Sequence, residues 1–552
     1  MLHKKYIRIF ILLMICFAGR QAIAQQEQRF EVSKQLDIFN AIVKEVEMFY
    51  VDSIQVDKMV RRGIDAMLRG LDPYTEYIPE NEVADLKTIQ TGEYGGVGAG
   101  INQRKEGVYI TDLYEGMPAD IAGLKVGDVF QKIDKVDVSK SSSDQVRDLL
   151  RGVPTSKLTV TVQRPGEKNT RKFDIIRKQV TVDPITYYGV YANNTGYIIQ
   201  SGFSEKTAQA VKAAFEDLKQ NHQITSLVLD LRGNGGGILD AAVQIANLFV
   251  RKGQEIVSTR GRNSQRDQIY RTSLNPIDTV IPIAVLTNSS SASASEILSG
   301  SLQDLDRAVI IGERSFGKGL VQSPRELPYN GVVKITISKY FIPSGRCIQQ
   351  MDYSHRNADG SVSAIPDSLT SVFYTSNGRP VRDGGGIRPD FEVEEPEWPT
   401  MLLYLYSDIA FFDYVTEWVQ AHPSIPPAAD FIYSDADFAS FKTYMKNKNF
   451  TYDRQSEKML KNLKEVAEFE GFIEKDTTLF ADLEAKLTPN LDRDMELHKD
   501  QIKKIISTEI VKRYYYDKGA MIERLKNDPV LEKALSVLHD QTLYRETLKI
   551  SQ

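Results

Sequence analysis

The chain has 552 residues, of which 41% are hydrophobic and 26% are charged, and its formal net charge is −5. This is the composition of an ordinary globular protein, and the length is too great for one hydrophobic core, so we expect about three or four domains. The acidic balance offers no basic footprint for nucleic acid, which disfavours a nucleic-acid-binding protein.

The N-terminus has the pattern of a cleaved signal peptide. Basic residues at positions 3–8 precede an apolar stretch at 9–17 and a small-x-small site at 22–24. The apolar stretch falls short of the ~20 residues that a membrane-spanning helix needs, so we expect export to the periplasm or envelope rather than anchoring. A lipoprotein attached through Cys16 is the weaker alternative, because Ile15 is bulky where lipid attachment wants a small residue.

Cleavage after residue 24 removes four basic residues and no acidic ones, so the net charge changes from −5 to −9. It also removes one of the two cysteines, which leaves Cys347 without an intramolecular partner. The fold must therefore rest on hydrophobic cores and not on disulfides.

Residues 28–91 are expected to form a small helical region. Apolar residues recur at mostly three- and four-residue spacing from Phe30 to Leu71, as on one face of a helix. Pro73 then forces a turn within residues 71–75.

Residues 92–180 are rich in glycine and in short alternating apolar runs that suit strands, such as Leu158–Val162. A glycine loop at 95–100 opens the segment, a Gly-Met-Pro-Ala stretch follows at 116–119, and a polar-capped helix is expected from Ser143 to Leu150. This order resembles a PDZ domain, in which a glycine loop offers backbone N–H groups to the terminal carboxylate of a bound peptide.

Residues 181–398 alternate between strands and helices, which predicts an α/β domain with buried, largely parallel strands. The expected strands are Gly196–Gln200, Ser226–Asp230 and Ile281–Leu286, and the expected helices are Glu205–Lys219 and Ile238–Val250. Residues 399–552 change to charged helical stretches, so we expect an all-helical C-terminal extension whose charges form a solvated face.

Ser293 stands in the serine-rich run 288–296, where a strand is expected to run into a helix. A serine at such a junction is presented at the end of a sheet, and the free N–H groups of the first helical turn point at the same spot. The Ala294 N–H is then a natural oxyanion donor. Because residues 293–296 also form a capping box, this segment alone leaves catalysis and plain helix capping both open.

A second segment, Val228–Gly237, is a hydrophobic strand that ends in glycines. Glycines lack β-carbons, so the backbone there can approach a substrate closely. We expect the Gly236 N–H to be the second oxyanion donor, with Gly237 as the alternative. A nucleotide-binding loop is the rival interpretation.

That rival has a further candidate in Gly312–Lys318, which matches the Gly-x4-Gly-Lys of a phosphate loop. Gly319 follows, where the loop requires Ser or Thr, and the next residues look extended instead of helical. Lys318 suits a general base better, provided that burial keeps its amine neutral. Gln322, four residues on, is uncharged and can orient that amine without holding it protonated. Ser293, Lys318 and Gln322 thus make a coherent triad.

Five motifs stand together in this chain: Ser291–Glu296, Arg314–Gln322, Asp230–Gly237, Tyr340–Arg346 and Gly386–Asp390. In combination they resemble the carboxyl-terminal processing (tail-specific) proteases, and the likeness spans residues 30–395. The resemblance implies a multidomain α+β protein, in which a PDZ domain is inserted before an α/β catalytic core of the ClpP/crotonase-like type. It implies a serine endopeptidase that cuts exported proteins near their C-termini, without metal or other cofactor.

The resemblance also bears on single residues. It implies Ser293 as the nucleophile, and not Ser291 or Ser295, because of its distance to Lys318 in the chain. Gly235 stands where many relatives carry proline or serine, so Gly237 stays the alternative to Gly236 as donor.

In this family a substrate tail held by the PDZ carboxylate loop favours an active arrangement; the loop residues here are Gly96, Val97, Gly98 and Ala99. Our hypothesis is that Arg151, at the end of the PDZ helix, couples tail binding to the catalytic site. The alternative is an exposed arginine that merely ends a helix.

Two functions from other classes compete with a protease. One is a catalytically inactive PDZ module that captures C-terminal tails, and the other is nucleotide binding. A metalloprotease is disfavoured, because the six histidines include no His-x-x-x-His pair. The sequence predicts protein or peptide partners with free C-terminal tails, and leaves open an adaptor lipoprotein, a homo-oligomer and the role of residues 400–552.

Overall fold

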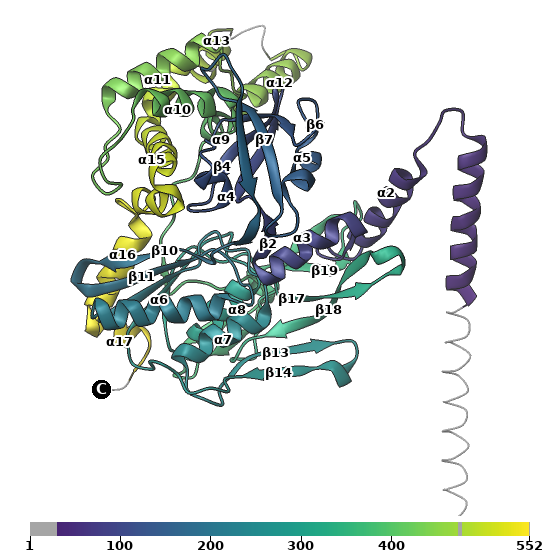
Figure 1. The fold of residues 1–552 in the computed structure, drawn as a ribbon. Coiled ribbons are helices and arrows are strands. Elements are labelled where there is room, and N and C mark those ends of the chain that lie inside the picture. Colours follow the sequence, from purple (N-terminus) through teal and green to yellow (C-terminus); the bar gives the residue numbers. More distant parts are fainter. Residues whose placement is uncertain (1–29, 473–476, 489, 551–552) are drawn as a thin grey trace, which may run out of the picture. The chain divides into compact units, whose positions relative to one another are not determined.

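The structure is a computed structural model that describes residues 30–472, 477–488 and 490–550 (Figure 1). The chain divides into two compact units, residues 1–81 with 322–336 and residues 82–321 with 337–552. The expected signal peptide and Cys16 lie outside the described residues. Among the residues that are described, no helix is both long enough and apolar enough to cross a membrane.

The first unit contains the expected N-terminal helical region. Residues 30–49 are helical, and α2 (Val56–Arg69) ends just before the predicted turn. In that turn the Asp72 carboxylate accepts hydrogen bonds from the N–H groups of Tyr74 and Thr75, at 2.9 and 2.8 Å. The short strand β1 (Glu76–Ile78) then pairs with the first residues of β18 (Val332–Phe341), which the sequence did not predict.

The second unit begins within α3 (Glu80–Thr91), and the expected PDZ domain follows this helix. Five strands form an antiparallel sheet in the order β3-β4-β5-β7-β8, and β6 pairs with β5 while β2 pairs with β9. The helix α5 (Ser143–Leu150) has the predicted bounds and begins with a capping box between Ser142 and Gln145. The other elements are β2 (Glu93–Gly96), β3 (Ala99–Arg104), β4 (Gly107–Leu113), α4 (Pro118–Ile121), β5 (Val129–Ile133), β6 (Val136–Asp137), β7 (Lys157–Gln163), β8 (Arg171–Ile176) and β9 (Lys178–Thr181).

A six-stranded sheet in the order β10-β11-β12-β15-β16-β23 organises the region that the sequence analysis expects to be catalytic. All neighbouring pairs are parallel except β10 with β11, as the alternating pattern predicted. Its strands are β10 (Ile185–Tyr191), β11 (Thr195–Gln200), β12 (Ser226–Asp230), β15 (Ile283–Thr287), β16 (Val309–Gly312) and β23 (Phe391–Glu392). The intervening helices are α6 (Thr207–Asn221), α7 (Leu239–Phe249) and α8 (Ala294–Asp304).

The other strands belong to separate sheets. Within the second unit, β13 pairs with β14 and with residues 338–341 of β18. The remaining strands are β13 (Glu255–Gly261), β14 (Gln268–Arg271), β17 (Leu320–Glu326), β19 (Met351–Arg356), β20 (Val362–Ala364), β21 (Val372–Tyr374) and β22 (Pro380–Arg382).

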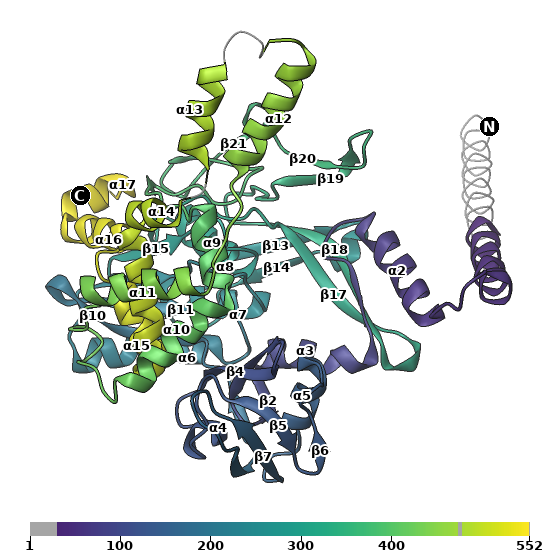
Figure 2. The same ribbon diagram turned by 90° about the horizontal axis from the view of Figure 1, so that it is seen from above.

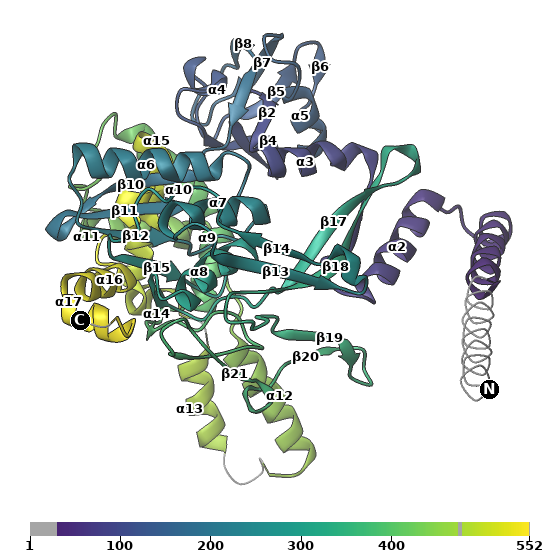
Figure 3. The same cartoon turned by 90° about the horizontal axis from the view of Figure 1, so that it is seen from below.

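The two faces of the six-stranded sheet are covered by different parts of the chain. Along β12, Leu227 and Leu229 pack with residues of α6, α7 and α8, whereas Val228 packs with residues of α16 and α17. This alternation is the period of a strand buried on both sides. The helices α16 and α17 therefore complete the hydrophobic core on one face of this sheet, and Figures 1 and 3 show both helices beside it.

The C-terminal extension is helical in its described residues, as expected. Its earlier helices share a core of their own, built around Phe411, Phe441 and Ile506. In this extension α12 and α13 lie side by side (Figure 2). The helices are α9 (Thr400–Ser407), α10 (Ile409–Ala421), α11 (Asp435–Asn447), α12 (Gln455–Phe469), α13 (Thr477–Leu487), α14 (Leu491–Leu497), α15 (Lys499–Arg524), α16 (Pro529–His539) and α17 (Gln541–Thr547).

Candidate active site

Ser293 lies where β15 has ended and α8 begins, as the sequence predicted. It is the residue directly before α8, with φ 55° and ψ −112°. Such a conformation is rare for a residue with a β-carbon and costs on the order of 1–3 kcal/mol, so the surrounding structure must enforce it. Strained residues of this kind are concentrated at functional sites.

The Glu296 carboxylate joins the turn that carries Ser293, the candidate nucleophile turn, to the loop that carries Lys318, the lysine loop. It accepts the backbone N–H of Ser293 at 2.8 Å and the backbone N–H of Lys318 at 2.9 Å. The Gly317 N–H and the Ser315 hydroxyl also donate to it, both at 2.6 Å. One fully buried side chain thus holds together the two segments that carry the predicted dyad.

The burial of Glu296 has an electrostatic consequence. Removal from water raises the pKa of its carboxyl group from 4.5 to about 7, although the donated hydrogen bonds oppose that rise. Ionised Glu296 accepts every donor around it, whereas the protonated form must turn one oxygen into a donor. The arrangement of the site is therefore best satisfied when this carboxylate is charged.

Tyr340 joins the same two segments through their carbonyl groups. Its hydroxyl donates to the Ser293 carbonyl oxygen at 3.1 Å and also to the Lys318 carbonyl oxygen. The ring is buried in the core of the catalytic region, which fixes the position of the hydroxyl. The N–H groups of Ser293 and Lys318 thus share the acceptor Glu296, and their carbonyl groups share the donor Tyr340.

The predicted oxyanion loop lies directly against the nucleophile turn. A β-carbon placed on Gly236 would lie 2.9 Å from the Ala294 nitrogen and 2.9 Å from the Ser293 β-carbon. One placed on Gly237 would lie 2.2 Å from the Phe203 carbonyl oxygen. Both positions have positive φ, of 97° and 149°, so glycine is needed for conformation as well as for space.

In this structure the Gly236 N–H donates to the side-chain oxygen of Asn234 at 2.9 Å. Asn234 is fully buried, and its backbone carbonyl oxygen accepts the Ala292 N–H at 3.0 Å and the Ser295 hydroxyl at 2.8 Å. Asn234 thus fastens the glycine loop to the serine run. The Gly236 N–H would have to exchange this internal acceptor for an oxyanion during catalysis.

The lysine loop is followed by a strand. Lys318 is half-buried and stands two residues before β17 (Leu320–Glu326), where a phosphate loop would begin a helix. Gln322 lies on this strand in the first unit, where its side chain donates to the Thr336 hydroxyl at 3.1 Å. In the described part of the chain, no cluster of three or more His, Cys, Asp or Glu is arranged to hold a metal ion.

Comparison with known proteins places these features in one family. The model of peptidase family S41 matches residues 194–354, a PDZ model matches 109–164, and a model described as "Probable PDZ-protease, C-terminal helical domain" matches 401–538. A carboxy-terminal-processing protease of Bartonella bacilliformis is 35% identical over 319 residues, which are 57% of this chain and 73% of that protein. The chain belongs to the carboxy-terminal-processing proteases of peptidase family S41.

Other relatives match over shorter shares. The chloroplastic C-terminal processing peptidase of Tetradesmus obliquus is 35% identical over 300 residues, which are 51% of this chain and 64% of that protein. Among solved structures, a photosystem II D1 C-terminal processing protease is 28% identical, with a TM-score of 0.35 and coverage of 64% of this chain and 92% of that one. The family makes this chain a serine protease with a PDZ domain and a C-terminal helical domain.

Residues 96–99, which the sequence analysis predicts to bind a substrate carboxylate, run from the last residue of β2 to the first residue of β3. The Val97 carbonyl oxygen accepts the Ala119 N–H at 2.8 Å, and the Gly98 carbonyl oxygen accepts the Tyr114 N–H at 3.1 Å. Gly98 has φ 74°, and a β-carbon there would lie 2.3 Å from that of Met117. The loop is therefore held in place by its carbonyl groups.

Arg151 ends α5, and its guanidinium pairs with Asp85 of α3 and lies 5.4 Å from the centre of the Tyr94 ring. It is thus more than an unpartnered arginine at a helix end. Its direct contacts are with α3 and β2, and not with the catalytic residues.

Sequence reasoning missed three residues of this protease site. Glu296 was recognised only as part of a capping box, Tyr340 only as part of a family motif, and Asn234 only as a residue among glycines. The three are buried polar side chains that each hydrogen-bond to more than one segment; that of Asn234 bonds the Gln200 carbonyl oxygen and the Gly236 N–H. A polar residue at a position expected to be buried was the available signal, because such groups need partners.

Proposed function

We propose that this protease is an endopeptidase that cleaves exported proteins near their C-termini through a Ser293–Lys318 dyad. The observation that carries the proposal is the double tie between the two residues: Glu296 accepts both backbone N–H groups, and Tyr340 donates to both carbonyl groups. A dyad needs its members held in fixed register, and these contacts supply that register. The fold of the catalytic core is of the ClpP/crotonase-like type.

In the proposed mechanism, neutral Lys318 takes the proton of the Ser293 hydroxyl as that oxygen attacks the substrate carbonyl carbon. Gln322 orients the lysine amine. The Ala294 and Gly236 N–H groups stabilise the negative oxygen of the tetrahedral intermediate, since both lie beside Ser293. Lys318 then protonates the leaving amine, and water hydrolyses the acyl-enzyme with the same groups in the same roles.

Substrate tails are bound by Gly96, Val97, Gly98 and Ala99 of the PDZ domain, and tail binding gates the catalytic site. A chain of contacts supports this coupling. Arg151 pairs with Asp85 of α3, and at the end of α3 the Gln90 carbonyl oxygen accepts the Glu205 N–H at 3.2 Å. Two residues before Glu205, the Phe203 N–H donates to the Gly236 carbonyl oxygen at 3.2 Å. A shift of α3 would therefore be transmitted through these hydrogen bonds to the oxyanion loop.

The signal-peptide pattern supports a site of action in the periplasm or envelope. An adaptor lipoprotein and a homo-oligomer are compatible with that location.

Peptide cleavage by four variants tests the dyad. Ser293→Ala and Lys318→Ala should each lower kcat by at least about a thousandfold while the protein stays folded, because each removes a member of the reacting pair. Ser290→Ala, in the same run, and Lys252→Ala are matched controls, since both side chains are exposed. Cleavage that survives in Ser293→Ala, with products of unchanged mass, would assign the nucleophile elsewhere, whereas a wild-type protein that binds C-terminal tails without cleaving them would be an inactive PDZ module.

A further inference from the structure

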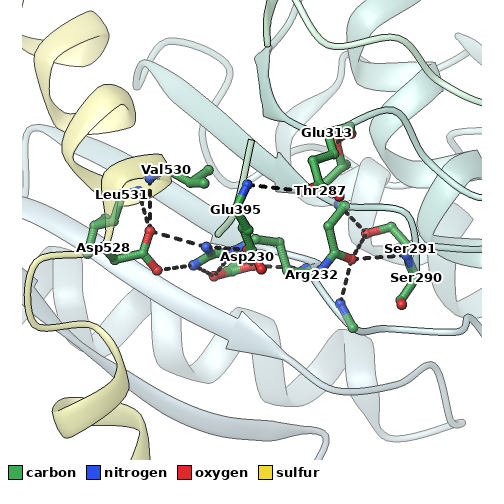
Figure 4. A network of polar contacts seen from close by, with 12 residues as sticks. Asp230, Arg232, Thr287, Ser290, Ser291, Glu313, Glu395, Asp528, Val530 and Leu531 are labelled. Atoms are coloured by element: carbon green, nitrogen blue, oxygen red, sulfur yellow. Dashed lines mark hydrogen bonds and ion pairs between the residues drawn. The ribbon is translucent and has the colours of Figure 1, made fainter. Parts of the chain in front are cut away.

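The strand β12 ends in a buried ion cluster that includes a residue from the far end of the chain. Arg232 directly precedes the glycine loop 233–237, and its side chain is only 5% exposed (Figure 4). Its guanidinium contacts the carboxylates of Asp230 at 2.7 Å, Glu395 at 2.8 Å and Asp528 at 2.8 Å. Asp528 is 296 positions away in the sequence.

Asp528 has two roles in this cluster. It is the N-cap of α16, where one carboxylate oxygen accepts the N–H groups of Val530 and Leu531, both at 2.9 Å. Both of its oxygens also contact the Arg232 guanidinium, and its side chain is 11% exposed. A charged hydrogen bond in such a site is stronger and more directional than the same contact in water. The start of α16 is therefore fixed to the end of β12.

From Arg232 the contacts continue into the catalytic site. The N–H of the next residue, Gly233, donates to the Asn288 side-chain oxygen at 3.0 Å, and Asn288 opens the serine run. Asn234 then binds that run through its carbonyl oxygen, as described above. The loop itself is four glycines around Asn234, so few side chains hold it in place. Its position depends on what fixes its ends, and Arg232 is one end.

We propose that Asp528 is a positioning residue for catalysis: the C-terminal helix α16 holds Arg232, and through it the oxyanion loop, in the arrangement that stabilises the tetrahedral intermediate. The proposal rests on the proposed function of Ser293. Loss of the Asp528 charge leaves Arg232 paired with Asp230 and Glu395, so no buried cation is left without a partner. The expected consequence is a misplaced loop in a folded protein.

Two variants separate the ion pair from the helix cap. Asp528→Asn retains a good N-cap and removes the charge, whereas Asp528→Glu keeps the charge. Asp540→Asn is the matched control, because Asp540 caps α17 in the same way, accepting the N–H groups of Thr542 and Leu543 at 3.1 and 3.0 Å. Each variant is assayed as the full chain for kcat, KM, thermal unfolding and inhibition by a peptide boronate, whose tetrahedral adduct occupies the oxyanion site.

We expect Asp528→Asn to lower kcat and boronate affinity by about tenfold with KM within about twofold of wild type, because misplacement near the reacting atoms acts on the transition state. Asp528→Glu should recover part of that loss, and Asp540→Asn should match wild type. A merely structural role would lower the melting temperature without this split between kcat and KM.

The proposal is overturned if Asp528→Asn keeps its kcat within about twofold of wild type, or if Asp540→Asn loses as much. If Asp528→Asn does not fold, Asp528→Ser is the second neutral cap. Failure of both to fold, while Asp540→Asn folds, would make Asp528 a structural residue and end the proposal. Ser293→Ala measured alongside keeps the two hypotheses apart, because a wild-type rate that does not need Ser293 refutes the proposed function instead.

Discussion

Replacement of Gly236 by alanine tests whether the glycine loop lies against the nucleophile as the structure shows. The new β-carbon would lie 2.6 Å from the Ala292 carbonyl oxygen and 2.9 Å from the Ala294 nitrogen. Both neighbours are backbone atoms of the turn that carries Ser293, so they cannot be relieved by a change of rotamer. The turn or the loop must move.

The magnitude follows from two separate costs. Alanine at the positive φ of Gly236 costs about 1 kcal/mol, and overpacking against backbone adds about 1–3 kcal/mol. Gly233→Ala is the matched control, because Gly233 also has positive φ, of 72°, but a β-carbon there would meet nothing within 4 Å. The control carries the conformational cost without the contact.

Both variants are assayed for thermal unfolding and for peptide cleavage. Gly233→Ala should lose about 1 kcal/mol of stability and keep most of its activity. Gly236→Ala should lose about 2–4 kcal/mol, and kcat should fall about a hundredfold, because a shift near 1 Å at reacting groups costs about that factor. A folded Gly236→Ala whose kcat lies within about threefold of Gly233→Ala would refute the placement of the loop.

Two further predictions concern pH and tail sensing. Burial raises the pKa of Glu296 from 4.5 to about 7, so between these pH values the folded state binds one more proton than the unfolded state. The contribution of Glu296 to the free energy of unfolding therefore falls by about 3 kcal/mol as pH rises through that window. The melting temperature of wild type should therefore drop relative to Glu296→Gln between pH 5 and pH 8, and a constant difference would contradict the assignment. Arg151→Ala should reduce the preference for peptides with a free C-terminal carboxylate over amidated ones, because it breaks the contact with Asp85. Arg147→Ala is its control, since that arginine pairs with Asp144 on the same helix. Unchanged cleavage rates and an unchanged tail preference in Arg151→Ala would refute the proposed coupling.

Local sequence patterns predicted the bounds of those helices and strands that begin or end at such a pattern. The bounds of β12 (Ser226–Asp230) and α5 (Ser143–Leu150) agree with the prediction, because a run of buried apolar residues and a capping box both act within a few positions. The helix α3 (Glu80–Thr91) was not singled out, since it has no buried residue and hence no clear apolar stripe.

The residues around the proposed dyad show which contacts local sequence patterns do not predict. A capping box relates Glu296 to Ser293 three positions away, but its bonds to Gly317 and Lys318 span more than 20 positions. The Tyr340 hydroxyl acts on carbonyl groups that only the folded chain places beside it. Patterns in a single sequence can identify candidate catalytic side chains. The groups that align those side chains are distant in sequence, so only the tertiary structure identifies them.

The C-terminal extension illustrates the same limit at larger scale. Its composition predicted a helical segment distinct from the catalytic region, and the described residues are helical. Composition did not reveal that Val530, Ala534 and Val537 of α16 pack on the sheet. The apolar face of a helix looks alike whether it covers another helix or a sheet.

Different parts of the chain cover the two faces of the six-stranded sheet, so these faces can be buried at different times during synthesis. The strand β15 is synthesised more than 200 residues before α16, which packs on one of its faces. Until that late segment has emerged, Ala284 and Leu286 lack the partners that bury them in the folded protein. The face of the six-stranded sheet that α16 and α17 cover is therefore completed only after residues 529–548 have been synthesised.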